Sequence, residues 1–386
     1  MLRFLTAGES HGPGLVTIVE GLPKGIEVSE DHIVTELGRR RHGHGRGARM
    51  DIEEDRLEIL GGIRHGRTLG SPVAVVVRNT EWPRWQEVMG VEPGEGGNPV
   101  TRPRPGHADL AGMIKYGTDD ARDILERASA RETAARTVAG ALAKRMLSVV
   151  GTSVISHVVA IGEVTVPDGP VPAPSDLGAI DASPVRCLRA DVSTAMVEAI
   201  DRAGEDKDTL GGVFEVLGHE VPFGLGSHVH HDRRLDGLVA GALMSIPGIK
   251  GVEIGEGFGL AFLRGSKAHD EIRPGETMPV RSSNRAGGIE GGISNGEPIR
   301  ARAAMKPLST LMRPLGTVDL ASGEEARAVR ERSDVCAVPA AAVVGEQMLA
   351  WVLASELQRK FGGDTVHELT RAVDSFSESL GHRFGR

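Results

Sequence analysis

Short β-branched runs and longer apolar runs with helical spacing alternate irregularly along the chain. A short apolar run at 2–5 and the run "LVTIVEGLPKG" from Leu15 flank a glycine-rich turn, which predicts a hairpin. The run "SPVAVVVRN" ending at Asn79 predicts another strand. The Pro/Gly-rich segment from Trp82 to Asp109 predicts a long loop, and long loops in compact domains are usually functional or mobile.

Helices are predicted where helical periodicity and capping residues coincide. Ser129-Ala130-Arg131-Glu132 fits a capping box before an Ala-rich run that stops at Gly151, although a start at Thr118 fits the pattern equally well. Three more helices are predicted, at 191–203, at 232–245 with Asp232 as N-cap, and from Pro339 to Gly362-Gly363. The last of these carries Glu346 and Gln347 midway, which indicates a buried core helix rather than a membrane span.

The chain also repeats itself faintly. "GGIRHGRTLGSPVAVVVR" from Gly61 resembles "GGISNGEPIRARAAMK" from Gly291, which predicts two related hairpin units. Short strands in both halves around long central helices, without regular βαβ alternation, predict an α+β fold built of layers. The 386 residues can bury a large core.

Composition narrows the class of protein. Only two cysteines are present, Cys187 and Cys336, which gives no disulfide framework and favours a reducing cytosol. The N-terminus lacks the apolar run of a signal peptide. His228, His230 and His231 have no third ligand set at a recognisable spacing, so no metal site is predicted. A net charge of −8 gives no global bias toward nucleic acid.

Positive charge is nevertheless concentrated in one loop. "GRRRHGHGRGARM", from Gly38 to Met50, contains arginines and histidines and no acid. Guanidinium groups match carboxylate and phosphate geometry, so the loop is expected to bind a small polyanion. The alternative is a solvated Arg/Gly loop that binds RNA, and its affinity would fall steeply with salt.

A second motif, "GESHG" at 8–12, matches the G-x-S-x-G turn of serine hydrolases. That turn lies between a buried strand and a helix, whereas Pro13-Gly14 and a predicted strand follow here. A hairpin turn therefore fits better than a hydrolase with Ser10 as nucleophile. On such a turn, His11 is expected to be exposed and to titrate near neutral pH.

Several motifs occur in order over nearly the whole chain: "GESHG", "GRGARM", "RPGHAD", "RASARET", "RAGGIEGGISNGEP", "AAMKPLST" and "RSDVCAVPAA". In this combination the sequence resembles the chorismate synthase family. The resemblance implies a single domain over 1–386, folded as a β-α-β sandwich of two antiparallel sheets around a central helical layer. It also implies a lyase that converts 5-enolpyruvylshikimate 3-phosphate to chorismate and phosphate by anti-1,4-elimination, using reduced FMN without net redox change.

The resemblance assigns roles to residues of this chain. His107 would donate to the departing phosphate, Asp334 would steer or relay a proton, and His11 would protonate the reduced flavin. Read singly, each has a structural alternative: Asp334 as N-cap of the helix at Pro339, His107 as cap of its own turn, and Lys306 as plain surface. The binding residues that the resemblance implies are Ser10, Arg40, Arg46 and Arg49 for substrate or NADPH, and Arg127, Ala128, Ser129, Pro247, Gly248, Gly291, Lys306, Pro307, Leu308, Ser309, Thr310 and Arg332 for the flavin.

One departure from the family pattern concerns Pro247-Gly248, where a pair such as Gln-Ala is expected; contacts there are predicted to come from the backbone. The resemblance further implies a cytoplasmic homotetramer in aromatic amino acid biosynthesis, with no nucleic acid or membrane partner. NADPH is the expected source of electrons, and since no extra domain is apparent, an external flavin reductase is favoured over reduction by the chain itself.

Overall fold

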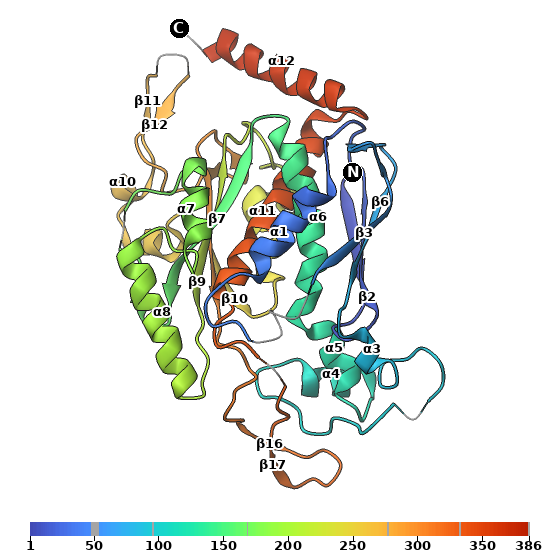
Figure 1. Cartoon of the computed structure of the whole chain (residues 1–386). Coiled ribbons are helices and arrows are strands. Elements are labelled where there is room, and N and C mark those ends of the chain that lie inside the picture. The colour runs from blue at the N-terminus through green and yellow to red at the C-terminus, as the bar shows by residue number, and fades with distance from the viewer. Residues whose placement is uncertain (48–53, 95, 168, 276–277, 332, 385–386) are drawn as a thin grey trace.

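Two antiparallel sheets lie on opposite sides of a layer of long helices (Figure 1). The computed structural model describes residues 1–47, 54–94, 96–167, 169–275, 278–331 and 333–384. The first sheet has the order β1 (Arg3–Ala7), β2 (Gly14–Glu20), β6 (Val73–Arg78) and β3 (Arg56–Gly61). The second has the order β10 (Ile249–Ile254), β15 (Ile299–Met305), β9 (Gly212–His219), β7 (Ser153–Ile161) and β8 (Val164–Thr165).

The helical layer consists of α1 (Glu30–Arg41), α6 (Thr133–Ser148) and α11 (Val338–Phe361). Helix α6 packs against β2, α11 packs against β7 and β9, and the two helices pack on each other (Figure 1). Small residues allow this close approach, because a Cβ atom added to Gly140 would lie 2.2 Å from Cβ of Gln347. The buried apolar side chains from Leu2 to Val373 form one contiguous cluster, so both sheets and the helices share a core.

Smaller elements surround this framework. A second, small cluster of buried side chains, which includes Met113 and Leu125, is formed by the segment that follows β6. The remaining helices are α3 (Trp82–Trp85), α4 (Asp109–Tyr116), α5 (Arg122–Ala128), α7 (Leu177–Ala182), α8 (Ala190–Glu205), α9 (Leu235–Met244), α10 (Gly265–Ala268) and α12 (Val366–Phe384). The 3₁₀ turns are η1 (Ala130–Glu132), η2 (Pro174–Asp176), η3 (His231–Arg233) and η4 (Gly257–Phe262). The remaining strands are β4 (Ile63–Arg64), β5 (Arg67–Thr68), β11 (Ile272–Arg273), β12 (Val280–Arg281), β13 (Ile289–Glu290), β14 (Ile293–Ser294), β16 (Gly316–Val318) and β17 (Glu325–Arg327).

Several predictions from the hydrophobic pattern are confirmed. Strands β1 and β2 form the antiparallel hairpin expected around the glycine-rich turn. The two repeated segments each form a short hairpin, β4–β5 and β13–β14, and each hairpin is followed by a strand in the middle of a sheet, β6 and β15. By length and composition α11 could cross a membrane, but 89% of its most apolar stretch is buried inside the protein, as the core-helix interpretation predicts.

Three local predictions need correction. The start at Thr118 is wrong, because a separate helix, α5, ends at Ala128; the start at Ser129 is confirmed, because Ser129 is the N-cap of η1, which runs directly into α6 at Thr133. The Ser129 side chain accepts from the backbone N–H of Arg131, but Glu132 does not complete the capping box, because its carboxylate pairs with Arg136.

Asp232 lies inside η3 and the N-cap of α9 is Arg234, so the predicted aspartate cap is absent. No helix is predicted from the sequence beyond Gly363, whereas α12 occupies Val366–Phe384.

Candidate functional site

Segments from both halves of the chain enclose a cavity of about 550 Å³ at one end of the helical layer. This volume is within the range of small-molecule sites. The wall combines apolar side chains of α11 with cationic and ionisable groups from loops. The lining residues used below are Ser10, His11, Arg40, Arg46, Arg104, Gly106, His107, Ala128, Ser129, Pro247, Gly248, Lys250, Lys306, Pro307, Leu308, Ser309, Thr310, Glu331, Asp334, Ala337, Ala340, Ala341 and Val344.

His11 is held rigidly at the turn between β1 and β2. Gly8 has φ +102°, and a Cβ there would lie 2.2 Å from the carbonyl oxygen of Gly14, so the tight turn requires glycine. The backbone N–H of His11 donates to Glu126 Oε2 at 2.8 Å, and its ring Nδ1 lies 2.8 Å from Oε1. The indole of Trp85 stacks on the imidazole at 3.9 Å between ring centroids. His11 is 7% exposed, so the predicted exposed position is wrong; the turn folds back onto α5.

The carboxylate that holds His11 is itself buried and ionised. Arg122, one turn earlier on α5, donates to Glu126 Oε1 at 3.0 Å. Burial alone would raise the pKa of Glu126, but its bonds with His11 and the charge of Arg122 lower that pKa below the ordinary value.

His107 lies in a second cluster of the same kind. Its ring Nδ1 makes a short hydrogen bond with the fully buried carboxylate of Asp109. Arg104 donates to the same carboxylate from Nε at 2.8 Å, and from Nη1 to Thr310 Oγ1 at 3.1 Å. Burial opposes ionisation of Asp109, yet the bonds from His107 and Arg104 hold its pKa below the ordinary value.

Asp334 faces the cavity from the segment before α11. Its Oδ1 accepts from the backbone N–H of Gly47 at 2.7 Å, and its Oδ2 lies 2.7 Å from Arg46 Nη1. The N-cap of α11 is Ala337, which makes no side-chain cap, so the alternative of Asp334 as N-cap is wrong. Arg40 reaches the same wall from the end of α1 and lies 3.8 Å from Asp55. The segment predicted as an Arg/Gly loop therefore begins inside α1, which ends at Arg41; its Arg40 and Arg46 line the cavity, while Arg49 lies outside the described residues.

Ser10 and Ser129 meet on the wall, where Ser129 Oγ donates to Ser10 Oγ at 3.1 Å. The imidazole next to Ser10 directs Nδ1 at Glu126, which is not the Ser–His arrangement of a hydrolase elbow. An orienting role for Ser10 stays a prediction.

The segment 306–310 forms another part of the wall. Lys306 Nζ donates to the carbonyl oxygen of Gly106 at 2.7 Å, and its backbone N–H donates to the carbonyl oxygen of Gly248 at 3.0 Å. Burial and the ammonium of Lys250 lower the pKa of Lys306. Two close cations in a partly buried wall favour an anionic ligand there, which does not fit the plain-surface alternative for Lys306.

Two sequence-predicted residues do not line the cavity. The Arg127 guanidinium donates to the carbonyl oxygens of Gly8 and Thr6, so it fastens the β1–β2 turn to α5. Gly291 lies in the turn between β13 and β14. Arg332 lies outside the described residues. All the other described residues predicted for the site do line the cavity: Ser10, His11, Arg40, Arg46, His107, Ala128, Ser129, Pro247, Gly248, Lys306, Pro307, Leu308, Ser309, Thr310 and Asp334.

Sequence reasoning missed four residues that shape this wall. Arg104 and Asp109 stand inside the motif "RPGHAD", and Glu126 precedes "RASARET", so position in a motif was the available signal. For Lys250 the sequence offered only a weaker indication, which is its position two residues after the unusual pair Pro247-Gly248.

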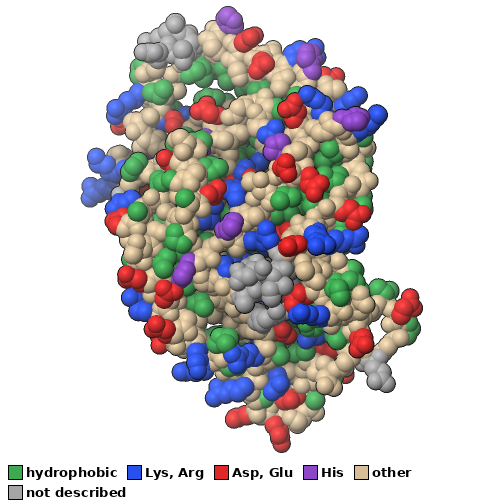
Figure 2. Space-filling view, in the orientation of Figure 1, with side chains coloured by type: hydrophobic (Ala, Val, Ile, Leu, Met, Phe, Trp, Pro, Cys, Tyr) green, Lys and Arg blue, Asp and Glu red, His purple; other side chains and the backbone are tan. Residues whose placement is uncertain are grey.

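Figure 2 shows that acidic and basic side chains are interspersed over the visible face. That face therefore shows no single continuous basic surface of the kind that nucleic-acid binding typically uses.

Comparison with known proteins agrees with this geometry. The family model for chorismate synthase matches residues 2–357. A chorismate synthase of Frankia casuarinae is 59% identical over 98% of this chain and 99% of its own length, and one of Thermobifida fusca is 58% identical over 98% and 99%. A crystal structure of chorismate synthase superposes with a TM-score of 0.80 at 42% identity and covers 99% of this chain and 98% of that chain. The chain belongs to the chorismate synthase family.

Proposed function

We propose that this cavity is where the chain eliminates phosphate from 5-enolpyruvylshikimate 3-phosphate to form chorismate. The observation that carries the proposal is the convergence of two carboxylate-bound imidazoles, Asp334 and several cations on one cavity with an apolar wall. The substrate has two carboxylates and a phosphate. Arg40, Arg46 and Arg104 are guanidinium groups that suit such anions.

The residues present also fit reduced FMN. Ala337, Ala340, Ala341 and Val344 give an apolar wall for a ring system, and Lys306 with Lys250 gives a cationic place for its phosphate. The residues that would hold it are Ala128, Ser129, Pro247, Gly248 and 306–310, with backbone groups serving at Pro247-Gly248. When bound, reduced FMN supplies electron density that assists loss of a non-acidic hydrogen.

The side chains of this chain have distinct tasks in the elimination. His107 donates a proton or hydrogen bond from its ring to the departing phosphate oxygen, which neutralises the charge that develops there. Asp334 accepts and relays the proton released from carbon, while Arg46 and the N–H of Gly47 hold its carboxylate in place. His11 holds a proton at the wall for the reductant, and Ser10 orients rather than attacks.

The oligomeric state of the chain and the source of its reduced FMN are inferred from its membership of the family. The layering of sheet, helices and sheet supports the proposal that the chain folds as a β-α-β sandwich in a single domain. A cytoplasmic homotetramer, with NADPH and an external flavin reductase as source of reduced FMN, completes the proposal.

The test is an anaerobic assay of the purified chain with 5-enolpyruvylshikimate 3-phosphate and reduced FMN. Chorismate and inorganic phosphate are expected one for one, and neither without FMN. Lys306→Ala is expected to weaken FMN binding at least tenfold in calorimetry with substrate present, while Lys267→Ala, an exposed lysine of α10, leaves it unchanged. Product formed without FMN, or equal effects of the two variants, would contradict the proposal.

A further inference from the structure

The two cavity histidines, His11 and His107, are held in the same way, and the proposed function does not explain why. In each, ring Nδ1 contacts a carboxylate whose side chain is at most 1% exposed: Glu126 for His11 and Asp109 for His107. Each carboxylate also pairs with an arginine, Arg122 at 3.0 Å and Arg104 at 2.8 Å. The result is two His–carboxylate–Arg clusters that border one cavity.

This geometry dictates which ring nitrogen carries the proton. An ionised carboxylate can only accept a hydrogen bond, so the nitrogen that faces it must be N–H. The arginine on each carboxylate keeps it ionised, which makes it a fixed acceptor rather than a proton store. In neutral His11 and His107 the proton therefore sits on Nδ1, and Nε2 is the acceptor nitrogen of each ring. Arg104 Nη2 lies 3.1 Å from Nδ1 and 3.5 Å from Nε2 of His107, and because a guanidinium can only donate, its contact with Nε2 is compatible with this tautomer.

Two other histidine–carboxylate pairs in the described chain have the opposite orientation. His157 approaches the buried Glu215 with Nε2 at 3.0 Å, and His44 approaches Asp201 with Nε2 at 2.6 Å. Neither pair lines the cavity. Among these four pairs, only the two cavity histidines contact their carboxylate through Nδ1.

We propose that Glu126 and Asp109 are positioning residues that fix the Nδ1–H tautomer of His11 and His107, so that Nε2 of each ring serves the reaction. The proposal deepens the proposed function and rests on it. Neither carboxylate touches the reacting atoms; each acts through its histidine.

The first experiment measures tautomers directly. The full chain is labelled with ¹⁵N-histidine, and long-range ¹H–¹⁵N spectra are recorded above neutral pH, with signals assigned by His11→Gln and His107→Gln. We expect protonated Nδ1 for His11 and His107 and protonated Nε2 for His157, which serves as an internal reference. Protonated Nε2 on either cavity histidine in the wild-type spectrum would overturn the inference.

The second experiment measures turnover. Glu126→Gln and Asp109→Asn are expected to lower kcat by about 10²–10⁴-fold, the range of a misplaced acid–base group, with KM for substrate changed much less. Glu126→Asp, which keeps a carboxylate, is expected to recover part of kcat. Glu215→Gln is the matched control, because it removes a buried histidine partner outside the cavity, and kcat is expected to stay unchanged.

The outcomes separate this inference from the function it rests on. A wild-type chain that makes no chorismate would overturn the proposed function and the inference together. A wild-type chain that makes chorismate, combined with unchanged kcat in Glu126→Gln and Asp109→Asn, would overturn the inference alone.

Discussion

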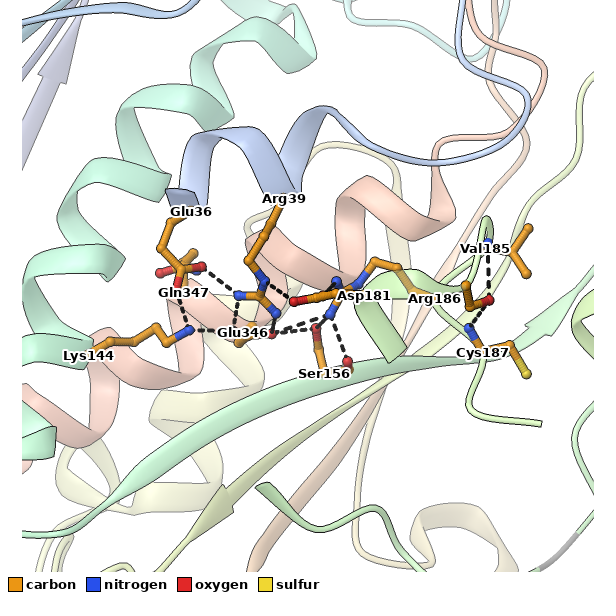
Figure 3. Close-up of polar contacts among 11 residues, drawn as sticks. Glu36, Arg39, Lys144, Ser156, Asp181, Val185, Arg186, Cys187, Glu346 and Gln347 are labelled. Atoms are coloured by element: carbon orange, nitrogen blue, oxygen red, sulfur yellow. Dashed lines mark hydrogen bonds and ion pairs between the residues drawn. The ribbon is translucent and has the colours of Figure 1, made fainter. Parts of the chain in front are cut away.

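Replacing Glu346 by glutamine tests how the helical layer tolerates its buried charges. Glu346 lies in the middle of α11 and is fully buried. Figure 3 shows side chains from α1, α6 and the second sheet pointing toward it, those of Arg39, Lys144 and Ser156. Arg39 donates to both carboxylate oxygens at 2.6 and 3.0 Å, Lys144 Nζ donates at 2.6 Å, and Ser156 Oγ donates at 2.8 Å.

The expected loss of stability in Glu346→Gln follows from the charge balance of this network. Three cations, Arg39, Lys144 and Arg186, face three carboxylates, those of Glu36, Asp181 and Glu346. Burial opposes ionisation of Glu346, but these cations hold its pKa below the ordinary value. Glutamine would leave one buried positive charge without compensation, and breaking a buried pair in this way costs about 3–5 kcal/mol.

The assay is urea unfolding at pH 7, followed by tryptophan fluorescence because Trp351 lies on α11. The free energy of unfolding of Glu346→Gln is expected to fall by about 3–5 kcal/mol. Asp191→Asn is the control: it breaks an ion pair with Arg189 in which both side chains are more than half exposed, and the solvent screens such pairs so that they contribute little to stability. Equal losses in the two variants would refute the reasoning.

Three further predictions concern single groups. Asp334→Asn is expected to lower kcat about 10²-fold or more with substrate affinity nearly intact, and unchanged turnover in a steady-state assay would remove its proton-relay role. Ser10→Ala is expected to retain most activity, because removing a nucleophile costs on the order of 10⁶-fold; a loss that large would revive the hydrolase. Burial raises the pKa of Glu215, but His157 and Arg300 lower it to about 2. The ionised carboxylate therefore stabilises the folded protein fully above the ordinary pKa of a glutamate, and this stabilisation is lost as the pH falls toward 2. In urea titrations, the difference between wild type and Glu215→Gln, on the order of 3 kcal/mol near pH 6, should shrink by pH 3; a constant difference would contradict the shifted pKa.

Local patterns predict much of the fold, and tertiary contacts explain most of the errors. The β1–β2 hairpin and α11 follow from alternation, Gly-rich turns and a proline in the first helical turn. The S-x-x-E pattern identifies Ser129 as an N-cap with extended backbone, but it does not reveal that the separate helix α5 ends immediately before it at Ala128.

The site shows the same division. Motifs identify His11, His107 and Asp334, but the burial of His11 depends on Glu126, which lies 115 residues away. The cationic pair of Lys250 and Lys306 forms only where β10 meets β15, so sequence spacing does not predict it.

The most direct test of the central claim is the redox balance of the reaction. Substrate and products have the same overall oxidation level, since proton and phosphate are simply lost. Under strict anaerobiosis, a trace of FMN and dithionite with this chain is predicted to convert many equivalents of 5-enolpyruvylshikimate 3-phosphate, with chorismate and phosphate appearing one for one. Consumption of one reductant for each chorismate formed would contradict the account.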